Sequence, residues 1–557
     1  MTAPVKPLPP YESPLDLLTE RLARWRLWLF TSLAALYLAG FTGEWRIGDD
    51  SALYLVLARS LAEGEGYRFG GEWHRFGYPG LPLLLAPLYR VFGEAARDAA
   101  TWVIFVTAAL TLAMTFRLFR LRAGVGVATA MVLLLGVCEN FYRYAFQARN
   151  DMPFLLGVVA VLAGYEGLRI GRERGGRPVL NWGLVAGGLI FATFMRPVML
   201  VLHLAVLTAA AWGIALGPKR AVHAGIGLAS IGSLLLFRVT DPRRSAPAML
   251  AGTTDETPLS REASSSSIDT SSVLVYESWL SNKLSSLPDT VAKGIGNYLV
   301  ELSWGGILSE SLFGIELGLG LLNALVALVL LTVGVLFART RLLWGFLIAS
   351  LVFQTVFRKP LERYLLPFVP LLLYAAWEVI RYLSSRIEKR FHPLVFAAGF
   401  GLLIGPNLVL CMAFVIEQRS TATWEIHDGG SYAGIALVSE MVNRHVPKDA
   451  LLISSEVRLL TLLTERPGLT PEHAYRSWIE FGIEPHEAVP EEVWAALRIP
   501  LQEEARHFIE SDRIEVSEQI WSTRGTIKAQ EQLGAAPEGW RLVKLRVRPL
   551  VDDAPRN

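Results

Sequence analysis

Long apolar runs constrain the fold of this 557-residue chain more than any other feature, because 52% of its residues are hydrophobic and only 19% are charged. A helix that crosses the hydrocarbon core of a bilayer needs about 20 predominantly apolar residues, so each run of roughly that length predicts a membrane span. We count about eleven such runs. They lie near residues 26–43, 98–118, 124–142, 152–168, 181–196, 198–215, 222–239, 314–338, 342–357, 364–381 and 394–416. The sequence therefore predicts a mainly α, polytopic membrane protein.

One stretch allows two interpretations. Residues 181–215 form either two short spans or one span and a re-entrant piece, with the break at Arg196-Pro197. The first apolar run, in contrast, is long and has no small-residue cleavage site after it. We therefore interpret that run as an uncleaved anchor and not as a removed signal peptide.

Basic residues accumulate in alternate loops between the runs, and this pattern indicates the orientation. The residues concerned are Arg117, Arg120 and Arg122; Arg169, Arg172, Arg174 and Arg177; Lys219 and Arg220; Arg339 and Arg341; and Arg381, Arg386, Lys389 and Arg390. The positive-inside rule places such loops in the cytoplasm. With about eleven spans, all of these loops and the N-terminus lie on the cytoplasmic side, and the C-terminus lies outside.

The outer segments are long enough to carry structure of their own. In the first outer loop, 44–97, residues 50–63 predict an amphipathic helix that ends at Gly64. Residues 81–92 are apolar but too short to span, so both pieces are expected in the membrane interface. The outer loop 240–312 contains a Ser-rich stretch, which predicts flexibility, and surface helices near 275–303.

From about residue 418 the composition changes, because charged residues become frequent and long apolar runs stop. Alternating apolar patterns predict strands at 451–454 and 540–547, and amphipathic patterns predict helices at 434–445 and 490–510. We therefore predict a transmembrane domain, 1–417, followed by a small extracytoplasmic α/β domain, 418–557.

Several classes of protein are disfavoured. The net charge is only +2, so no basic field indicates a nucleic-acid partner. Cys138 and Cys411, the two cysteines, lie within apolar runs and are expected to pack as buried thiols. The nine histidines are scattered, and no P-loop, GxSxG or HExxH motif is present, so we predict no metal and no cofactor.

Two adjacent carboxylates follow the first span. Asp49 and Asp50 precede an apolar helical stretch, and Tyr54 lies four residues after Asp50 on the same helix face. A charged group is costly in hydrocarbon, so this pair belongs at the membrane face or in a wet cavity. The structural alternative is that Asp50 caps its helix, and capping is compatible with a chemical role.

A third outer carboxylate, Asp151, precedes the fourth span, where it also suits a helix cap. Basic and aromatic side chains accompany the carboxylates on the outer side. They are His74, Arg75, Arg358, Lys359, Arg363 and Tyr364, with Arg196 at the break described above. Each cation is either a snorkelling anchor or a ligand for phosphate, which arginine binds through two parallel hydrogen bonds.

Several different short motifs follow one another along the chain. They are Gly48-Asp49-Asp50-(x3)-Tyr54; Ala58-(x2)-Leu61-(x2)-Gly64-(x)-Gly66-Tyr67; Arg75-(x3)-Pro79-(x)-Leu81-Pro82; Phe92-Gly93 with Arg97; Asp151; Arg363-Tyr364-(x2)-Pro367-(x2)-Pro370; and, in the C-terminal segment, Val446-Pro447-(x)-Asp449-Ala450 and Leu463-Thr464-Glu465-Arg466. This set resembles the GT-C class of membrane glycosyltransferases, and within it the bacterial protein O-mannosyltransferase and aminoarabinose transferase-like group. The family often has an Asp-Glu pair in its first loop. Here Asp50 matches the Asp by its spacing to Tyr54, Ser51 stands in place of Glu, and the choice of base between Asp49 and Asp50 stays open.

The resemblance implies a multi-pass enzyme of the bacterial inner membrane that transfers a sugar from a polyprenyl phosphate to a lipid, glycan or protein outside the cytoplasm. It implies one-step inverting transfer without a metal, with Asp50 or Asp49 as general base and Asp151 placing the acceptor or stabilising the sugar-ring charge. Arg75, Arg358, Lys359 and Arg363 would bind the donor phosphate, and Tyr54, His74, Tyr364 and Arg196 would position substrate.

A transporter or lipid flippase with an outer partner-binding domain is the main alternative, since such a protein also places Asp and Arg near its spans. A transporter should carry carboxylates near span centres, whereas those of this chain lie at the outer ends. A non-catalytic scaffold with a partner-binding outer domain is a further alternative.

Overall fold

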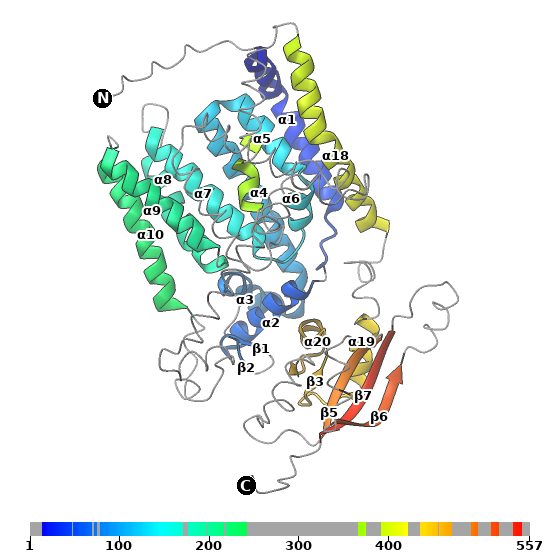
Figure 1. Ribbon diagram of the computed structural model, residues 1–557. Helices are drawn as coiled ribbons and strands as arrows, with labels where there is room; N and C mark the ends of the chain where they lie inside the picture. The colour runs from blue at the N-terminus through cyan, green and yellow to red at the C-terminus, as the bar shows by residue number, and fades with distance from the viewer. Residues whose placement is uncertain are drawn as a thin grey trace, which may run out of the picture. The chain divides into compact units, whose positions relative to one another are not determined.

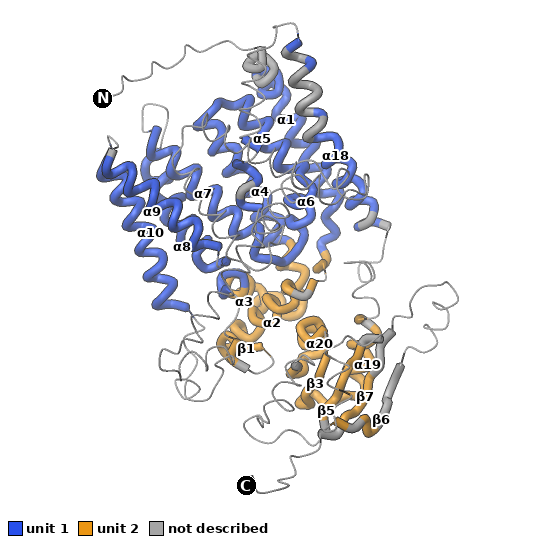
Figure 2. The backbone as a smooth tube through the Cα atoms, in the orientation of Figure 1, with its two compact units in different colours: residues 1–43, 77–81, 102–419 blue, residues 44–76, 82–101, 420–557 orange. Residues whose placement is uncertain are grey.

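The structure is a computed structural model. It describes residues 14–46, 48–69, 72–74, 78–170, 177–196, 198–216, 219–241, 366–371, 373–374, 391–420, 435–454, 456–469, 492–499, 509, 514–522 and 539–547. The chain divides into two compact units, shown in different colours in Figure 2. Unit 1 comprises residues 1–43, 77–81 and 102–419, and unit 2 comprises residues 44–76, 82–101 and 420–557.

Unit 1 is helical in its described part (Figure 1). Its helices are α1 (Pro14–Gly40), most of α4 (Ala96–Ala123), α5 (Val125–Gly136), α6 (Glu139–Tyr144), α7 (Asp151–Ile170), α8 (Pro178–Met195), α9 (Met199–Leu216), α10 (Arg220–Thr240), the 3₁₀ turn η8 (Leu366–Phe368) and α18 (His392–Ser420).

Four described helical segments are long and apolar enough to cross a membrane. They are Gly80–Ala123, Asp151–Ile170, Pro178–Met195 and Arg220–Thr240, and the shorter apolar helices are Val125–Gly136, Met199–Ala215 and Ile404–Ile416. The prediction of a mainly helical, multi-pass membrane protein is confirmed at this level. The count of about eleven spans stays a prediction, because 314–338 and 342–357 lie outside the described residues and 364–381 lies largely outside them.

The ambiguous stretch 181–215 forms two helices. Helix α8 ends at Met195 and α9 begins at Met199, and between them Arg196 has extended backbone angles, φ −154° and ψ 152°. The following proline in the sequence explains the break, because a residue before proline is disfavoured in the α conformation.

Helices α7 and α8 pack closely because glycines line their contact. A Cβ on Gly188 would lie 2.8 Å from the carbonyl oxygen of Gly157, and one on Gly164 would lie 2.7 Å from the carbonyl oxygen of Asn181. Lipid tails are as apolar as leucine, so close backbone approach through small residues is the usual way to hold such helices together. The α7 and α8 backbones therefore pack closely together within unit 1.

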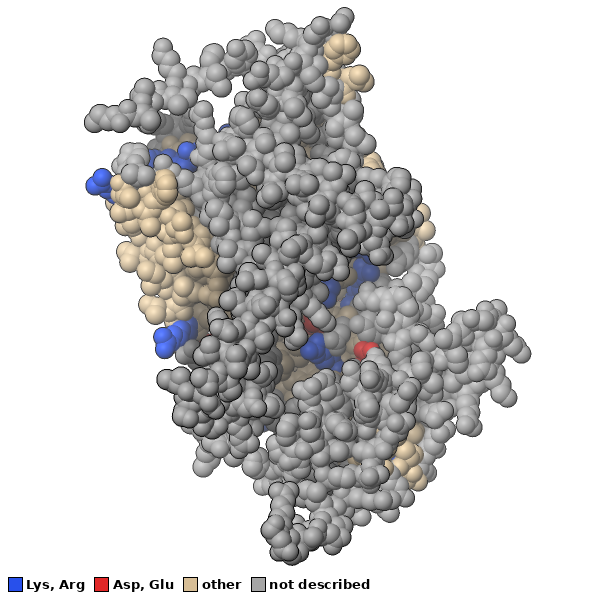
Figure 3. All heavy atoms as spheres, in the orientation of Figure 1, with Lys and Arg blue, Asp and Glu red and all other residues tan. Residues whose placement is uncertain are grey.

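The outward face of α10 is apolar. Leu228, Leu235 and Val239 are 70%, 56% and 82% exposed. Figure 3 shows a continuous uncharged surface over this part of the molecule, with basic side chains at its ends. Exposed leucine and valine along a span-length helix are expected where lipid is the solvent, and basic ends suit the two interfaces.

Unit 2 combines the first loop with the C-terminal segment. Its first-loop elements are α2 (Asp49–Glu63), the β1–β2 ladder (Arg68–Phe69 with Glu72–Trp73), α3 (Gly80–Phe92), whose first two residues lie in unit 1, and the 3₁₀ turn η1 (Gly93–Ala95). The predicted helix 50–63 is confirmed as α2. Gly64 ends the helix with φ 83°, a left-handed conformation that glycine adopts without the steric cost of a Cβ.

The C-terminal segment forms two helices and a mixed sheet. The helices are α19 (Ile435–His445) and α20 (Val457–Thr464), and the strands are β3 (Leu452–Ile453), β4 (Gly468–Leu469), β5 (Glu492–Ile499), β6 (Ile514–Ser522) and β7 (Gly539–Val547). The strand order is β4-β3-β5-β7-β6, with β3 parallel to β4 and β5 and the remaining pairs antiparallel. The predicted strands at 451–454 and 540–547 and the helix at 434–445 are confirmed as β3, β7 and α19.

The predicted helix at 490–510 is wrong over its described first part, which is strand β5. This strand lies between β3 and β7 and is hydrogen-bonded to both, and Val493, Ala495 and Leu497 along it are buried. A strand in the middle of a sheet reads as a nearly continuous apolar run, which periodicity cannot distinguish from a buried helix. Burial between two neighbouring strands overrides the helix propensity of its alanines and leucine.

The division of the chain at residue 417 is a prediction that the packing does not test directly. The outer loop 240–312 lies outside the described residues apart from Thr240 and Asp241, and so do the helices expected near 275–303.

Candidate functional site

The first turn of α2 carries the acidic pair. Gly48 is the N-cap residue, with extended backbone angles, and the helix begins at Asp49, so Asp50 is not the cap and the capping interpretation is wrong. The Ser51 hydroxyl donates to the Gly48 carbonyl oxygen at 2.7 Å, and the Trp45 indole N–H donates to Ser51 Oγ at 3.1 Å. Acidic residues in the first turn are also stabilised by the positive end of the helix dipole. The backbone of Asp50 is thereby fixed at the start of a buried helix.

Asp50 has a basic neighbour from a distant part of the chain. Its Oδ1 lies 3.5 Å from Arg458 Nη1, and the two side chains are 26% and 36% exposed. Tyr54, one turn further along α2, is half-buried. Arg458 is on α20, and sequence reasoning missed it because no local signal connects residues 408 positions apart.

His74 follows β2 in the same unit. Its backbone N–H donates to the Tyr67 carbonyl oxygen at 2.9 Å, and its ring centroid lies 5.9 Å from that of Tyr67. Tyr67 is fully buried and packs with Leu53 and Leu57 of α2. The position of His74 is therefore tied to α2 through a small aromatic and apolar cluster.

Asp151 and Arg196 form a buried ion pair in unit 1. Arg196 Nη1 lies 2.7 Å from Asp151 Oδ1, and the two side chains are only 5% and 1% exposed. The neighbouring Asn150 side chain donates to the Met195 carbonyl oxygen at 2.7 Å. Among the described residues neither oxygen of Asp151 accepts a well-aligned hydrogen bond, so the guanidinium is what compensates its buried charge. Two predicted site residues 45 positions apart thus join the start of α7 to the α8–α9 break.

The other predicted residues lie outside the description. These are Arg75, Arg358, Lys359, Arg363 and Tyr364, together with the side chain of Asp49. Asp50 belongs to unit 2, whereas Asp151 and Arg196 belong to unit 1. The convergence of the carboxylates on one pocket therefore stays a prediction.

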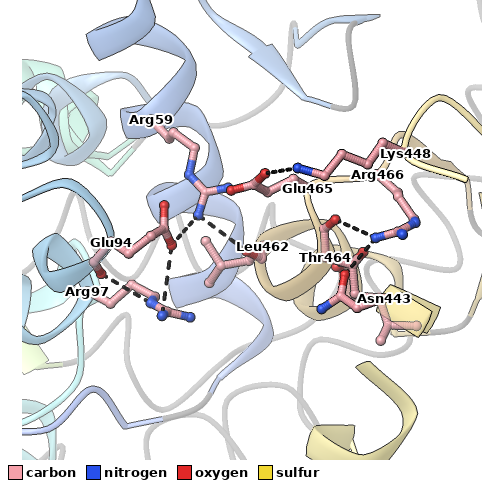
Figure 4. Close-up of polar contacts among 10 residues, drawn as sticks. Arg59, Glu94, Arg97, Asn443, Lys448, Leu462, Thr464, Glu465 and Arg466 are labelled. Atoms are coloured by element: carbon pink, nitrogen blue, oxygen red, sulfur yellow. Dashed lines mark hydrogen bonds and ion pairs between the residues drawn. The ribbon is translucent and has the colours of Figure 1, made fainter. Parts of the chain in front are cut away.

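Arg59, the basic residue of α2, was also not predicted as a site residue. Its Nη2 lies 2.8 Å from Glu94 Oε2 and donates to the Leu462 carbonyl oxygen at 3.3 Å, and its Nη1 lies 3.5 Å from Glu465 Oε1. Figure 4 shows the Arg59 guanidinium between the two glutamates. The side chain is only 12% exposed, and its guanidinium carbon lies 5.6 Å from the centre of the Tyr89 ring.

Arg466 organises the C-terminal segment (Figure 4). It donates to the carbonyl oxygens of Val446, Pro447 and Thr464 and, at 2.7 Å, to Asn443 Oδ1. Burial lowers the pKa of the Arg466 guanidinium, and these acceptors compensate the buried charge. The residue ties the end of α19 to the end of α20.

A buried histidine connects three helices of unit 1. His203 Nε2 lies 2.8 Å from Thr193 Oγ1 of α8, and its Nδ1 lies 2.7 Å from Ser230 Oγ of α10. Both hydroxyl residues are fully buried, so the imidazole satisfies polar groups that would otherwise be costly among apolar helices.

A metal centre has no support in the part of the chain that is described, where no three His, Cys, Asp or Glu residues lie close enough together to hold an ion. The absence of a metal and of a cofactor stays a prediction for the chain as a whole.

Known structures share this fold. No protein-family model and no curated protein sequence matches the chain. Among solved structures, ArnT from Cupriavidus metallidurans in the apo state matches with a TM-score of 0.55 and 14% identity, covering 94% of this chain and 97% of that one. ArnT bound to undecaprenyl phosphate matches with a TM-score of 0.54 and 13% identity over the same shares.

A third structure is more distant. The Archaeoglobus fulgidus oligosaccharyltransferase complex with zinc and sulfate has a TM-score of 0.49 and 12% identity, covering 83% of this chain and 67% of that one.

The chain shares the fold of ArnT, so the resemblance to GT-C membrane glycosyltransferases found in the sequence is confirmed at the level of the fold. Within that class, the chain is similar over nearly its whole length to ArnT, an aminoarabinose transferase. At 14% identity the similarity shows a shared architecture and does not by itself show a shared reaction.

Proposed function

We propose that the protein is an inverting glycosyltransferase that moves a sugar from a polyprenyl-phosphate donor to a lipid, glycan or protein acceptor outside the cytoplasm. The observation that carries this proposal is the match over 94% of the chain to ArnT, a protein crystallised both alone and with undecaprenyl phosphate. The acidic first turn of α2 supplies the carboxylate to which this proposal assigns the role of base.

In the proposed step, Asp50 accepts the proton of the acceptor hydroxyl. The freed oxygen forms a bond to the anomeric carbon on the face opposite the donor phosphate, and the bond between that carbon and the phosphate oxygen breaks. The electron pair leaves with the polyprenyl phosphate, and the proton passes from Asp50 to solvent. General base catalysis of this kind contributes about 10²–10⁴-fold in rate.

The remaining predicted residues take supporting roles in this proposal. Arg75, Arg358, Lys359 and Arg363 stabilise the charge of the departing phosphate, as preorganised cations do. Asp151, held by Arg196 at 2.7 Å, orients the acceptor or stabilises the sugar-ring charge. Tyr54, His74 and Tyr364 position substrate.

The proposed location is the bacterial inner membrane, with the N-terminus cytoplasmic and the C-terminal domain outside. Apolar helices and basic inner loops support it. A lipid-linked donor is consistent with a site at the outer membrane face, where nucleotide sugars are not expected.

The test is transfer by the purified protein in nanodiscs, using a panel of polyprenyl-phosphate sugars with extracted envelope glycolipids and mass spectrometry of the products. Asp50→Asn should lower turnover by about 10²-fold or more while the protein still inserts and folds. Asp49→Asn should do less harm, and Asp449→Asn, at an exposed position of the C-terminal segment, should have no effect.

Other outcomes reassign the function or the base. If Asp49→Asn were the more damaging change, the base would be Asp49. If the wild type formed no product with any donor but moved lipid-linked sugars across vesicles, and Asp50→Asn moved them equally fast, the transporter interpretation would replace catalysis.

A further inference from the structure

Helices α2 and α20 lie side by side in unit 2 although about 400 residues separate them in sequence (Figure 2). Each presents a buried apolar side: Leu55 and Ala58 of α2 are fully buried, and so are Leu459 and Leu460 of α20. The C-terminal segment therefore packs directly against the helix that carries the candidate base.

Polar contacts join the two helices at both ends. Near their starts, Asp50 Oδ1 lies 3.5 Å from Arg458 Nη1. Near their ends, Arg59 donates to the Leu462 carbonyl oxygen at 3.3 Å and lies 3.5 Å from Glu465 Oε1. Start meets start and end meets end, so the helices run in the same direction.

The Arg59 contacts near the ends of the helices limit how far Arg458 can move relative to Asp50. Asp50 and Arg59 are about 14 Å apart along the helix axis, at 1.5 Å per residue. A single exposed ion pair leaves two long side chains free to move, and such pairs contribute little. Here Arg59 is 12% exposed and is also held by Glu94 at 2.8 Å, so α20 can neither slide nor rotate along α2 without losing several contacts.

We propose that Arg458 is a positioning residue for the reaction, acting through Asp50. Its guanidinium orients the Asp50 carboxylate toward the acceptor hydroxyl, and α20 thereby makes the C-terminal segment part of the catalytic site. Catalytic groups must be held within a fraction of an ångström of productive geometry, and misplacement by about 1 Å can lower the rate about 100-fold. This inference rests on the proposed function.

The test compares Arg458→Gln, Arg458→Lys and Arg444→Gln in the full-length protein. Arg444 is the matched control, because it pairs with Glu440 at 3.4 Å on the neighbouring helix α19 and is 63% exposed. We expect Arg458→Gln to lower kcat about 10-fold or more with KM for the donor within about 2-fold of wild type. Arg458→Lys should recover most of that loss, since it keeps the charge, and Arg444→Gln should match the wild type.

Hydrogen exchange of the α2 amides adds a measurement that needs no activity. Arg458→Gln should speed exchange in the first turn of α2, around Asp50, whereas Arg444→Gln should not, because Arg458 pairs with Asp50 and Arg444 pairs with Glu440 of α19. The variant thus separates loss of positioning from general unfolding, which would speed exchange along all of unit 2.

The outcomes are distinct. An active wild type with unchanged kcat in Arg458→Gln would overturn the positioning role and leave the proposed function intact. A fall in kcat that Arg458→Lys does not recover at all would show that packing, and not the cation, is what matters, which also overturns it. A wild type with no transferase activity would remove the proposed function, and with it the positioning role of Arg458, whatever the exchange data show.

Discussion

Replacing Arg196 with methionine should destabilise the protein by about 3–5 kcal/mol, because it leaves the Asp151 carboxylate buried without its partner. The carboxylate is 1% exposed, and in the described part of the chain the guanidinium at 2.7 Å is its nearest compensating charge. Asp151→Asn should cost a similar amount, since it leaves the guanidinium unpaired. Each single substitution leaves one buried charge without its partner.

The double variant is the informative one. With charge centres about 4 Å apart and an effective dielectric constant near 20, the attraction is about 4 kcal/mol. Removing both charges also removes both desolvation penalties, so Asp151→Asn with Arg196→Met should lie close to the wild type. Since the two single changes together should cost about 6–10 kcal/mol and the double variant almost nothing, the coupling energy should be about 6–10 kcal/mol.

The assay is unfolding of the detergent-solubilised protein on titration with SDS, followed by tryptophan fluorescence for the wild type, both single variants and the double variant. The matched control is a second cycle on Glu440 and Arg444, a pair on α19 with both side chains more than 60% exposed. That cycle should give only about 0.3–0.5 kcal/mol.

Additive effects of the two substitutions, within about 0.5 kcal/mol, would refute the reasoning that Asp151 and Arg196 compensate each other. Transferase activity measured on the same four proteins separates two roles. A folded but inactive double variant supports the site role proposed for Asp151, and a folded, fully active one limits the pair to holding α7 against the α8–α9 break.

Two further predictions concern stability, one through packing and one through hydrogen bonds. Gly80→Ala should destabilise the protein by about 1–3 kcal/mol, because the added Cβ would lie 2.6 Å from the Phe194 carbonyl oxygen. Gly187→Ala is the control and should be neutral or stabilising, because a Cβ there meets open space. SDS titration compares the two variants, and equal stability would contradict the predicted clash. Arg466→Lys should destabilise by roughly 2–3 kcal/mol, because one ammonium cannot replace a guanidinium that reaches four acceptors. Thermal unfolding against the exposed control Arg444→Lys checks this, and a similar small shift in both would show that the Arg466 contacts contribute little.

Local signals in the sequence predicted individual elements well. Span-length apolar runs located α4, α7, α8 and α10 because the bilayer sets the length of a helix whatever its neighbours are. Gly64 correctly marked the end of α2, because its left-handed backbone suits glycine. In both cases the cause lies within a few residues of its effect.

Elements whose state depends on neighbours were predicted less well. The segment at 492–499 has a helical composition, and hydrogen bonding to β3 and β7 makes it a strand. Asp50 looked like a helix cap, whereas Gly48 takes that position and leaves the carboxylate near Arg458.

The sequence by itself determined that the chain crosses a membrane repeatedly, that an acidic pair opens the helix after the first apolar run, and that the order of motifs resembles GT-C glycosyltransferases. Those properties follow from hydrophobicity and local backbone preference, which act over about 20 residues. Only the tertiary structure decided which charges meet: Asp151 with Arg196, Asp50 with Arg458, and Arg59 with Glu94 and Glu465. The partners are far apart in sequence, and a charge selects its partner by proximity in space, which no local pattern records.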